Sequence, residues 1–109
     1  MDEFVVVYVT VGSAEEAKRI SYALVEEGLA ACVNRVASVQ SVYRWQGKVE
    51  QSEEELLIIK TKRELFDRLR SRVQALHSYA VPEIIALPIL EANEGYLKWL
   101  GEQLVASKK

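Results

Sequence analysis

The sequence predicts an α+β domain whose elements run in the order β-α-β-β-α-β, followed by a final helix. Three observations predict it: an almost continuously apolar opening run, two helical segments with capping signals and periodic apolar faces, and a long hairpin between them. The chain has 109 residues, 50% hydrophobic and 28% charged, which is typical of one soluble globular domain. We therefore treat residues 1–109 as a single domain.

The first strand is predicted at Phe4 to Val11, where nearly every residue is apolar and many are β-branched. Such a run is typical of a strand buried on both faces. Ser13 and Glu16 then have the spacing of a capping box, and Gly28 suits the C-terminal cap, so a helix is expected between them. Its apolar face recurs at helical spacing at Ala17, Ile20, Ser21, Leu24 and Val25.

A long hairpin follows, with arms at Ala30 to Trp45 and Lys48 to Thr61 and a turn at Gln46-Gly47. An arm of about 14 residues spans roughly 46 Å, whereas a domain of this length is roughly 34 Å across. The hairpin must therefore protrude. Because an exposed two-stranded ribbon is marginal in water, we expect another copy of the chain to cover it. Its outer half carries Val39, Val42, Tyr43, Trp45 and Val49.

Thr61 and Glu64 form a second capping-box pattern, which predicts a helix starting near Thr61. The apolar stripe of this helix is Leu65, Phe66, Leu69, Val73 and Leu76. A last strand is predicted from Glu83 to Leu90, after Pro82, and Asn93 is expected to cap the final helix. The inner face of that helix would be Tyr96, Leu97, Leu100 and Leu104.

This order of elements is the split βαβ, ferredoxin-like order, which predicts a four-stranded antiparallel sheet with helices on one face. Apolar residues occur on both sides of the strands, so the second face also needs cover. Three copies arranged around a shared centre would bury it, and a dimer would satisfy the same requirement.

The formal net charge of −2, with basic and acidic residues interleaved, gives no basic surface for nucleic acid. The apolar run Phe4 to Val11 is too short to cross a membrane. The start, Met1 to Glu3, lacks the basic region of a secretory signal, and the single cysteine, Cys32, excludes an intrachain disulfide. We therefore expect a cytoplasmic protein without nucleic-acid or membrane partners.

Cys32, His77 and Glu83 are the candidate metal ligands. Taken alone, a single loop histidine is more often a polar surface residue, and a small thiol is more often core packing. One Cys and one His cannot complete a tetrahedral site, but a site shared between subunits with Glu83 added would do so. No nucleophile–base pair or G-x-S-x-G motif is present, so we expect no enzymatic activity.

Three other groups of residues have less specific interpretations. Tyr43 and Trp45 would stack on a planar ligand or, as we favour, become buried against a neighbouring subunit. Lys60 and Lys62 flank the predicted helix start, where free backbone amides attract anions, although solvated lysines are the favoured interpretation. The acidic run at 53–55 is interpreted as a solvated stretch.

Five ordered sequence blocks spanning the chain resemble the CutA divalent-cation tolerance proteins. They are Leu29-Ala30-Ala31-Cys32-Val33-Asn34, Ser41-Val42-Tyr43-Arg44-Trp45, Lys60-Thr61, His77-x-Tyr79-x-Val81-Pro82-Glu83-Ile84 and Tyr96-Leu97-x-Trp99-Leu100. The resemblance implies a cytoplasmic protein with a ferredoxin-like fold that forms a tight trimer through its long strands. It also implies a link to tolerance of copper and other divalent metals, and an architecture similar to that of the PII signalling proteins.

Within this resemblance, Cys32 and His77 match the shared thiol and imidazole of the family, and Glu83 matches the carboxylate beside the proline. The chain also departs from the family. Ser78 stands where many members have proline, and Leu76 and Val9 stand where some have a second histidine and a cysteine. A copper site built from those extra ligands cannot form here.

Two functions remain open from the sequence, with a purely structural interaction module as a third. The first is weak binding of copper or another divalent cation at the subunit interfaces of a homotrimer, with no metal required for folding. The second is a PII-like trimeric regulator that binds a small anionic ligand or nucleotide and signals to a partner protein. Lys60, Lys62 and the aromatic residues would carry that second role.

Overall fold

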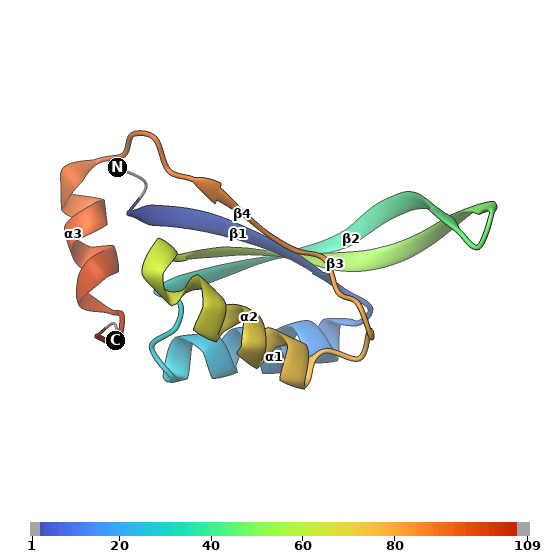
Figure 1. Ribbon diagram of the computed structural model, residues 1–109, viewed down its shortest axis with the longest axis horizontal. Helices are drawn as coiled ribbons and strands as arrows, with labels where there is room; N and C mark the ends of the chain where they lie inside the picture. Colours follow the sequence, from blue (N-terminus) through green and yellow to red (C-terminus); the bar gives the residue numbers. More distant parts are fainter. Residues whose placement is uncertain (1–2, 107–109) are drawn as a thin grey trace.

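The structure, a computed structural model, describes residues 3–106, and its elements follow the predicted order (Figure 1). The strands are β1 (Phe4–Val11), β2 (Cys32–Trp45), β3 (Lys48–Lys62) and β4 (Ile84–Pro88). The helices are α1 (Ala14–Glu26), α2 (Phe66–Leu76) and α3 (Glu94–Glu102), with a 3₁₀ turn at Arg63–Leu65 before α2. Over the described residues the protein is therefore a mixed α+β fold with a four-stranded sheet and three α-helices.

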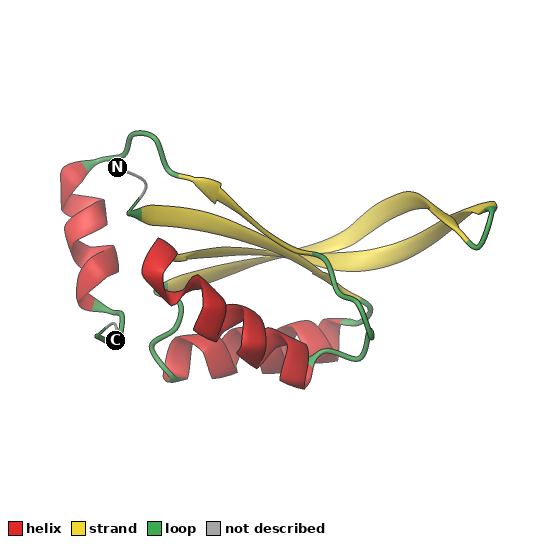
Figure 2. Ribbon diagram, viewed as in Figure 1, coloured by secondary structure: helices red, strands yellow, loops and turns green. Residues whose placement is uncertain are grey.

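The sheet has the strand order β2-β3-β1-β4, and every neighbouring pair is antiparallel. β1 lies between β3 and β4, so Val9 pairs with Leu57 on one side and with Ile84 on the other. Both α1 and α2 lie against one face of the sheet (Figures 1 and 2), while α3 lies beside the end of the sheet where β1 begins. Only one face of the sheet is therefore covered by the long helices.

The hydrophobic core lies between this covered face and the two helices. The helix-facing side chains of β1 are Val5, Val7, Val9 and Val11, each at most 4% exposed. The same cluster includes Leu57 and Ile59 of β3, Ile20 and Leu24 of α1, and Leu69 and Val73 of α2. Burying each large apolar side chain stabilises the fold by about 1.5–3 kcal/mol relative to leaving it exposed. Most of the periodic positions predicted for α1 and α2 contribute to this core, but Val25 does not, because it is 44% exposed.

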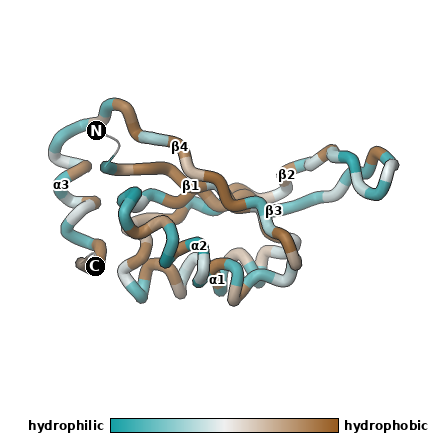
Figure 3. Tube along the Cα trace, in the orientation of Figure 1, coloured by the Kyte–Doolittle hydropathy of each residue, from teal (hydrophilic) through white to brown (hydrophobic). Residues whose placement is uncertain are grey.

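The opposite face of the sheet is apolar and has neither long helix over it. Val6 pairs with Leu87, and Tyr8 pairs with both Ile58 and Ile85. Leu87 is 44% exposed and Ile85 is 49% exposed. Figure 3 shows the apolar colour along both β1 and β4. The prediction that β1 is buried on both faces is therefore wrong within one chain, because its second face is only half-buried.

The hairpin of β2 and β3 projects well beyond the helices, as predicted (Figure 1). Its strands contain 14 and 15 residues, and the longest dimension of the described chain is 44 Å, against 26 and 25 Å in the other directions. At its tip, Gln46 and Gly47 have φ values of 51° and 81°, which suit a two-residue type I′ turn. Trp45 is 61% and Val49 is 68% exposed, so the apolar surface of the arm is uncovered in one chain.

A β-bulge interrupts the pairing of this hairpin at Ser38, whose φ is 62°. Val36 pairs with Leu56, whereas Val39 pairs with Glu54. One extra residue of β2 is thus accommodated between these two pairs. Because residues two apart on β3 share a face, Val36 and Val39 also share a face although they are three positions apart.

The bulge determines on which face of the sheet the side chains of the outer arm lie. Tyr43 and Trp45 alternate with Val39, so they lie on the face that carries Val36 and Cys32. That face is the one opposite α1 and α2 (Figure 1), which carries Tyr8 and Ile85, and it is called the helix-free face below. Without the extra residue, strand alternation would place the two aromatic side chains on the opposite side. The bulge therefore joins the aromatic arm and the helix-free face into one surface.

One predicted helix start is wrong. Thr61 belongs to β3, and its buried hydroxyl donates a 2.7 Å hydrogen bond to the carbonyl of Leu29. The following α-helix begins at Phe66, and Leu65 at its N-cap supplies no side-chain hydrogen bond. Thr61 does not cap this helix because it lies within β3, where its hydroxyl satisfies a buried backbone carbonyl.

The C-terminal part follows its prediction more closely. β4 is shorter than the predicted strand from Glu83 to Leu90. Asn93 caps α3 as predicted, because its side-chain oxygen accepts a 3.0 Å hydrogen bond from the Gly95 amide. Leu100 is the residue of α3 that is fully buried, whereas Tyr96 is 41% exposed. Within the described residues, no helix is both long and apolar enough to span a membrane.

Candidate functional site

His77 lies at the C-terminal end of α2, and its side chain is completely buried. Its Nε2 atom lies 2.8 Å from the carbonyl oxygen of Thr10, and its Nδ1 atom lies 3.0 Å from the backbone nitrogen of Tyr79. A carbonyl oxygen can only accept, so Nε2 carries the proton, and Nδ1 accepts from the Tyr79 N–H. The interpretation of His77 as a polar surface residue is therefore wrong, because both of its nitrogens are satisfied inside the fold.

Glu16, in the first turn of α1, holds Ser78, the residue after His77, through hydrogen bonds. Its buried carboxylate accepts a 2.7 Å hydrogen bond from the Ser78 backbone N–H and a 2.9 Å hydrogen bond from the Ser78 hydroxyl. The nearer carboxylate oxygen also lies 3.4 Å from Nδ1 of His77. Ser13 caps α1 as predicted, through the Glu16 amide. The sequence pattern accounted for that cap but not for the carboxylate of Glu16, which reaches a loop 62 residues away.

Tyr79 continues the same cluster to the base of the hairpin. Its hydroxyl donates a 2.7 Å hydrogen bond to the carboxylate of Glu54, a residue that is only 9% exposed. Burial, and then the hydrogen bond to Glu54, raise the pKa of the Tyr79 phenol to about 12. Its ring centroid lies 4.7 Å from that of His77. The interpretation of residues 53–55 as a solvated acidic stretch is thus wrong for Glu54, which is buried and bonded to a residue 25 positions away in the sequence.

Gly12 provides the space that the Tyr79 hydroxyl occupies. A Cβ atom at position 12 would lie 3.2 Å from the Tyr79 oxygen, which is closer than nearly all such contacts. A side chain there would therefore press on the phenol. The cluster is thus built from the end of β1, the first turn of α1, the base of β3 and the loop after α2.

Cys32 lies elsewhere, at the start of β2 on the helix-free face. Its side chain is half-buried, and its sulfur lies 3.9 Å from the side-chain oxygen of Asn34. Burial, and then the Cys32 thiol, raise the pKa of the Tyr96 phenol, so this hydroxyl lies against the sulfur. The thiol is therefore not core packing of the kind the sequence favoured, because it lies on a surface that this chain leaves partly open.

A single chain does not bring the three predicted ligands together. Cys32 pairs with Lys60, whereas Thr10, the carbonyl partner of His77, pairs with Leu56. Four residues of extended chain separate those positions, a distance of roughly 13 Å. Glu83 is exposed just before β4. Within the described residues of one chain, no group of three or more His, Cys, Asp or Glu side chains is arranged to hold a metal ion.

The lysines considered for an anionic ligand have other partners. Lys60 hydrogen-bonds to the side chain of Asn34, and Lys62 lies 3.7 Å from the Glu3 carboxylate and over the Phe4 ring. Because Thr61 is in a strand, no helix N-terminus lies between them. These contacts remove the local arrangement on which the anion interpretation depended.

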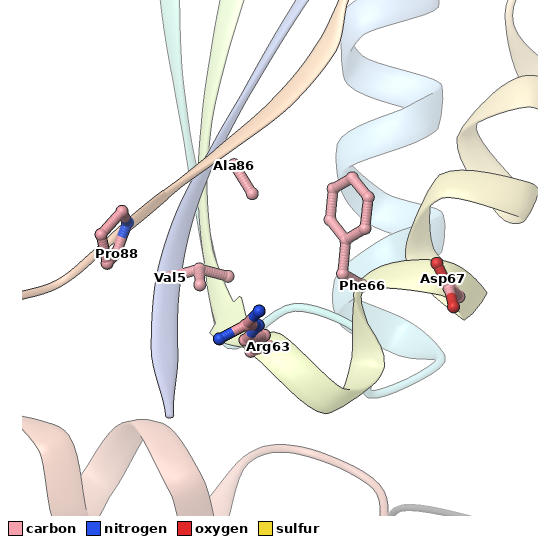
Figure 4. A pocket seen from close by; sticks show the side chains of 6 residues that line it. All are labelled: Val5, Arg63, Phe66, Asp67, Ala86 and Pro88. Atoms are coloured by element: carbon pink, nitrogen blue, oxygen red, sulfur yellow. The ribbon is translucent and has the colours of Figure 1, made fainter. Parts of the chain in front are cut away.

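The sheet also leaves a pocket of about 410 Å³ between β4 and the start of α2 (Figure 4). Its lining is Val5, Arg63, Phe66, Asp67, Ala86 and Pro88. The lining combines apolar groups with one cation and one carboxylate. Val5 and Ala86 lie toward the opposite end of β1 from Thr10, so the pocket is separate from the His77 cluster.

Residues 5–103 match the sequence profile of the family described as CutA1 divalent ion tolerance protein. The chain is 57% identical over 97 residues to the divalent-cation tolerance protein CutA of Thermus thermophilus, covering 89% of this chain and 94% of that protein. It is 52% identical over 96 residues to the chloroplastic CutA protein of Arabidopsis thaliana, covering 88% of this chain and 53% of that protein. It thus spans about half the length of this plant relative.

Solved structures agree with these sequence matches. The crystal structure of CutA1 from Oryza sativa superposes with a TM-score of 0.94 at 50% identity, covering 96% of each chain. The Thermus thermophilus divalent cation tolerance protein superposes with a TM-score of 0.92 at 54% identity, covering 94% of this chain and 99% of that one. A third similar structure, from Archaeoglobus fulgidus, is described as a periplasmic divalent cation tolerance protein, with a TM-score of 0.89 at 41% identity over 92% of this chain and 97% of that one.

Proposed function

The chain belongs to the CutA1 divalent ion tolerance protein family, and from this premise we propose that it binds divalent cations at the subunit interfaces of a homotrimer. The observation that carries the proposal is the position of Cys32. A thiol suits soft and borderline cations such as copper and zinc. Here it lies half-buried on an apolar sheet face that this chain leaves partly open. Such a face gains stability when another copy buries it.

The strand order β2-β3-β1-β4, with two crossover helices on one face, supports the proposed ferredoxin-like classification of this single domain. The trimer is supported by two surfaces that need cover, the helix-free face and the projecting arm. Because the bulge at Ser38 makes these surfaces continuous, one neighbouring copy would contact both. The PII-like architecture is proposed on the same grounds.

The proposed ligands are Cys32, His77 and Glu83, contributed by different copies because one chain holds them apart. As a donor set they fit a divalent cation such as zinc, which accepts thiolate, imidazole and carboxylate. Cys32 and Glu83 are at least partly accessible, whereas Nδ1 of His77 already accepts the Tyr79 N–H. Weak binding follows, since that hydrogen bond must break before His77 can bind a metal.

Titration of the protein with copper(II) and zinc(II) tests the ligand assignment. The variants are Cys32→Ser, Glu83→Gln and His77→Ala, and each should weaken binding. His77→Gln is a second histidine variant that keeps an amide donor and an acceptor for the buried partners. Equal metal affinity in the wild type and in His77→Gln would remove His77 from the site.

The alternative of a PII-like regulator that binds a small anionic ligand or nucleotide has less support. Lys60 and Lys62 are engaged by Asn34 and Glu3, and Thr61 is not at a helix N-terminus. A melting shift caused by nucleotides but not by metals would favour that alternative over metal binding. Signalling to a partner protein would then follow from the same trimeric architecture.

We also propose that the protein is not an enzyme and that it acts in the cytoplasm. The family and its Thermus thermophilus member are named for divalent-cation tolerance, and none of the CutA proteins cited above is named for a reaction. Relatives with chloroplastic and periplasmic names show that the compartment varies within the family. Fractionation of cells that express this protein would decide its compartment.

A further inference from the structure

We propose that Nδ1 of His77 and the carboxylate of Glu16 form a two-ligand cation site that Ser78 and Tyr79 keep closed. Together Ser78 and Tyr79 are called the latch below. The inference rests on the proposed function, because it describes how the proposed ligand His77 becomes available. It adds Glu16 as a ligand and assigns a regulatory role to the latch.

The first argument is the state of the imidazole. Nε2 donates to the Thr10 carbonyl, so only Nδ1 offers a lone pair. The Tyr79 N–H occupies that lone pair at 3.0 Å, and the ring is completely buried. A cation and an N–H group cannot share one lone pair. Metal binding at His77 therefore requires the Tyr79 amide to move away.

The second argument is the distance between His77 and Glu16. Nδ1 lies 3.4 Å from the Glu16 oxygen that accepts the Ser78 N–H. Ligand atoms about 2.1 Å from a tetrahedral zinc ion lie about 3.4 Å from each other. The two atoms thus already have the separation of neighbouring zinc ligands. Opening of the latch would free both of them at once, because Ser78 is bound to one and Tyr79 to the other.

The third argument is that the latch is anchored at several points. Ser78 is held by two hydrogen bonds to Glu16 on α1, and the Tyr79 hydroxyl is held by Glu54 on β3. Gly12 leaves the space into which that hydroxyl fits. The closed state therefore depends on side chains that need not touch the cation. Some of them can be changed without altering either proposed ligand.

The apparent affinity of a site that is open only part of the time equals its intrinsic affinity multiplied by the open fraction. A substitution that weakens only the closed latch should therefore tighten metal binding. Tyr79→Phe removes the bond to Glu54, and Ser78→Ala removes the hydroxyl bond to Glu16. Each bond is to a carboxylate, so each change should raise the apparent affinity by about tenfold.

The experiment is calorimetric titration of the full-length protein with zinc(II), which is redox-inert toward Cys32. Tyr79→Phe and Ser78→Ala should bind zinc more tightly than the wild type. The matched control, Tyr22→Phe, alters an exposed phenol on α1 and should bind zinc as the wild type does. Unchanged affinity in both latch variants would overturn the latch.

The Glu16→Gln variant tests whether Glu16 binds the cation or only holds Ser78 in place. If Glu16 only anchors Ser78, the weaker anchor should open the latch and tighten zinc binding. If Glu16 is also a ligand, the loss of its charge should weaken binding, and this is the expected result. Tighter binding in Glu16→Gln would therefore exclude the proposed ligand role.

Hydrogen exchange of the wild type provides a second readout that needs no variant. The Tyr79 amide should be protected without zinc and should exchange faster when zinc is added, with no such change in His77→Gln. Persistent protection of this amide at saturating zinc would contradict the latch. If His77→Gln binds zinc as tightly as the wild type, the ligand assignment fails and the latch fails with it. If His77→Gln weakens binding while the latch variants behave as the wild type, only the latch fails.

Discussion

The carboxylate of Glu16 accepts two hydrogen bonds from Ser78, one from its backbone N–H at 2.7 Å and one from its hydroxyl at 2.9 Å. This contact joins the first turn of α1 to the loop after α2. Both carboxylate oxygens are used, and the Glu16 side chain is 8% exposed. A charged group in this position is tolerated because its hydrogen bonds replace those lost to water.

Glu16→Ala should destabilise the fold by about 2 kcal/mol, because it removes two hydrogen bonds that join Ser78 to a buried carboxylate. Chemical denaturation followed by circular dichroism measures the loss. The control is Glu15→Ala, which removes an exposed carboxylate from the same helical turn and should change stability little. Equal effects of the two substitutions would show that the Ser78 contact contributes nothing.

The Tyr79 phenol should ionise at unusually high pH, because burial and Glu54 raise its pKa to about 12. A group whose pKa is raised on folding contributes stability that is present below its unfolded pKa of about 10. That contribution should be lost as the pH rises from about 10 to about 12. The difference in phenolate absorbance between the wild type and Tyr79→Phe isolates this titration. A midpoint near the ordinary phenol value of about 10 would contradict the Tyr79–Glu54 contact.

Ser38→Gly should stabilise the protein by about 0.5–1 kcal/mol, because the left-handed φ of 62° at the bulge disfavours residues with a Cβ. Ser38→Val should destabilise it, since β-branched side chains are the least compatible with this conformation. Thermal unfolding of both variants tests the pair. The bulge assignment fails if valine is tolerated as well as glycine.

Trp45→Ala should weaken assembly more than it perturbs an isolated subunit, because the side chain is 61% exposed in one chain. The control is Tyr22→Ala, which truncates an aromatic side chain that is 58% exposed on α1, away from the arm. Sedimentation should show dissociation at higher concentration for Trp45→Ala alone. Unchanged mass and melting of Trp45→Ala under dilution would count against its burial by a neighbour.

Treatment with a chelator should leave the fold intact. The core is built from apolar side chains such as Val7, Leu57 and Ile20, which can pack without a metal ion. Structural zinc domains, in contrast, unfold when their metal is removed. Circular dichroism and melting should therefore be unchanged after exhaustive dialysis against a chelator. Loss of secondary structure would show that a metal supports the fold.

The order of the elements could be predicted from the sequence because local signals agree with tertiary packing. Ser13 and Asn93 look like caps and act as caps. Thr61 looks like a cap but is used elsewhere, since the Leu29 carbonyl that it satisfies is far away in sequence. Local patterns cannot reveal a competing partner of this kind.

The candidate site was less predictable for the same reason. The motif around His77 directed the prediction to the loop after α2, but the buried partners Glu16 and Glu54 resemble ordinary helical and strand carboxylates. The bulge at Ser38 could not be predicted, because a serine and not a glycine occupies the position with positive φ. Without knowledge of the bulge, the face occupied by Tyr43 and Trp45 could not be assigned.

Sedimentation equilibrium of the wild-type protein over a wide dilution series tests the account most directly. The helix-free sheet face and the exposed arm predict a species with three times the mass of one chain, which persists on dilution while the protein remains folded. Stable, fully folded single chains at low concentration would contradict the account, because the proposed shared metal site would then have no second copy to complete it.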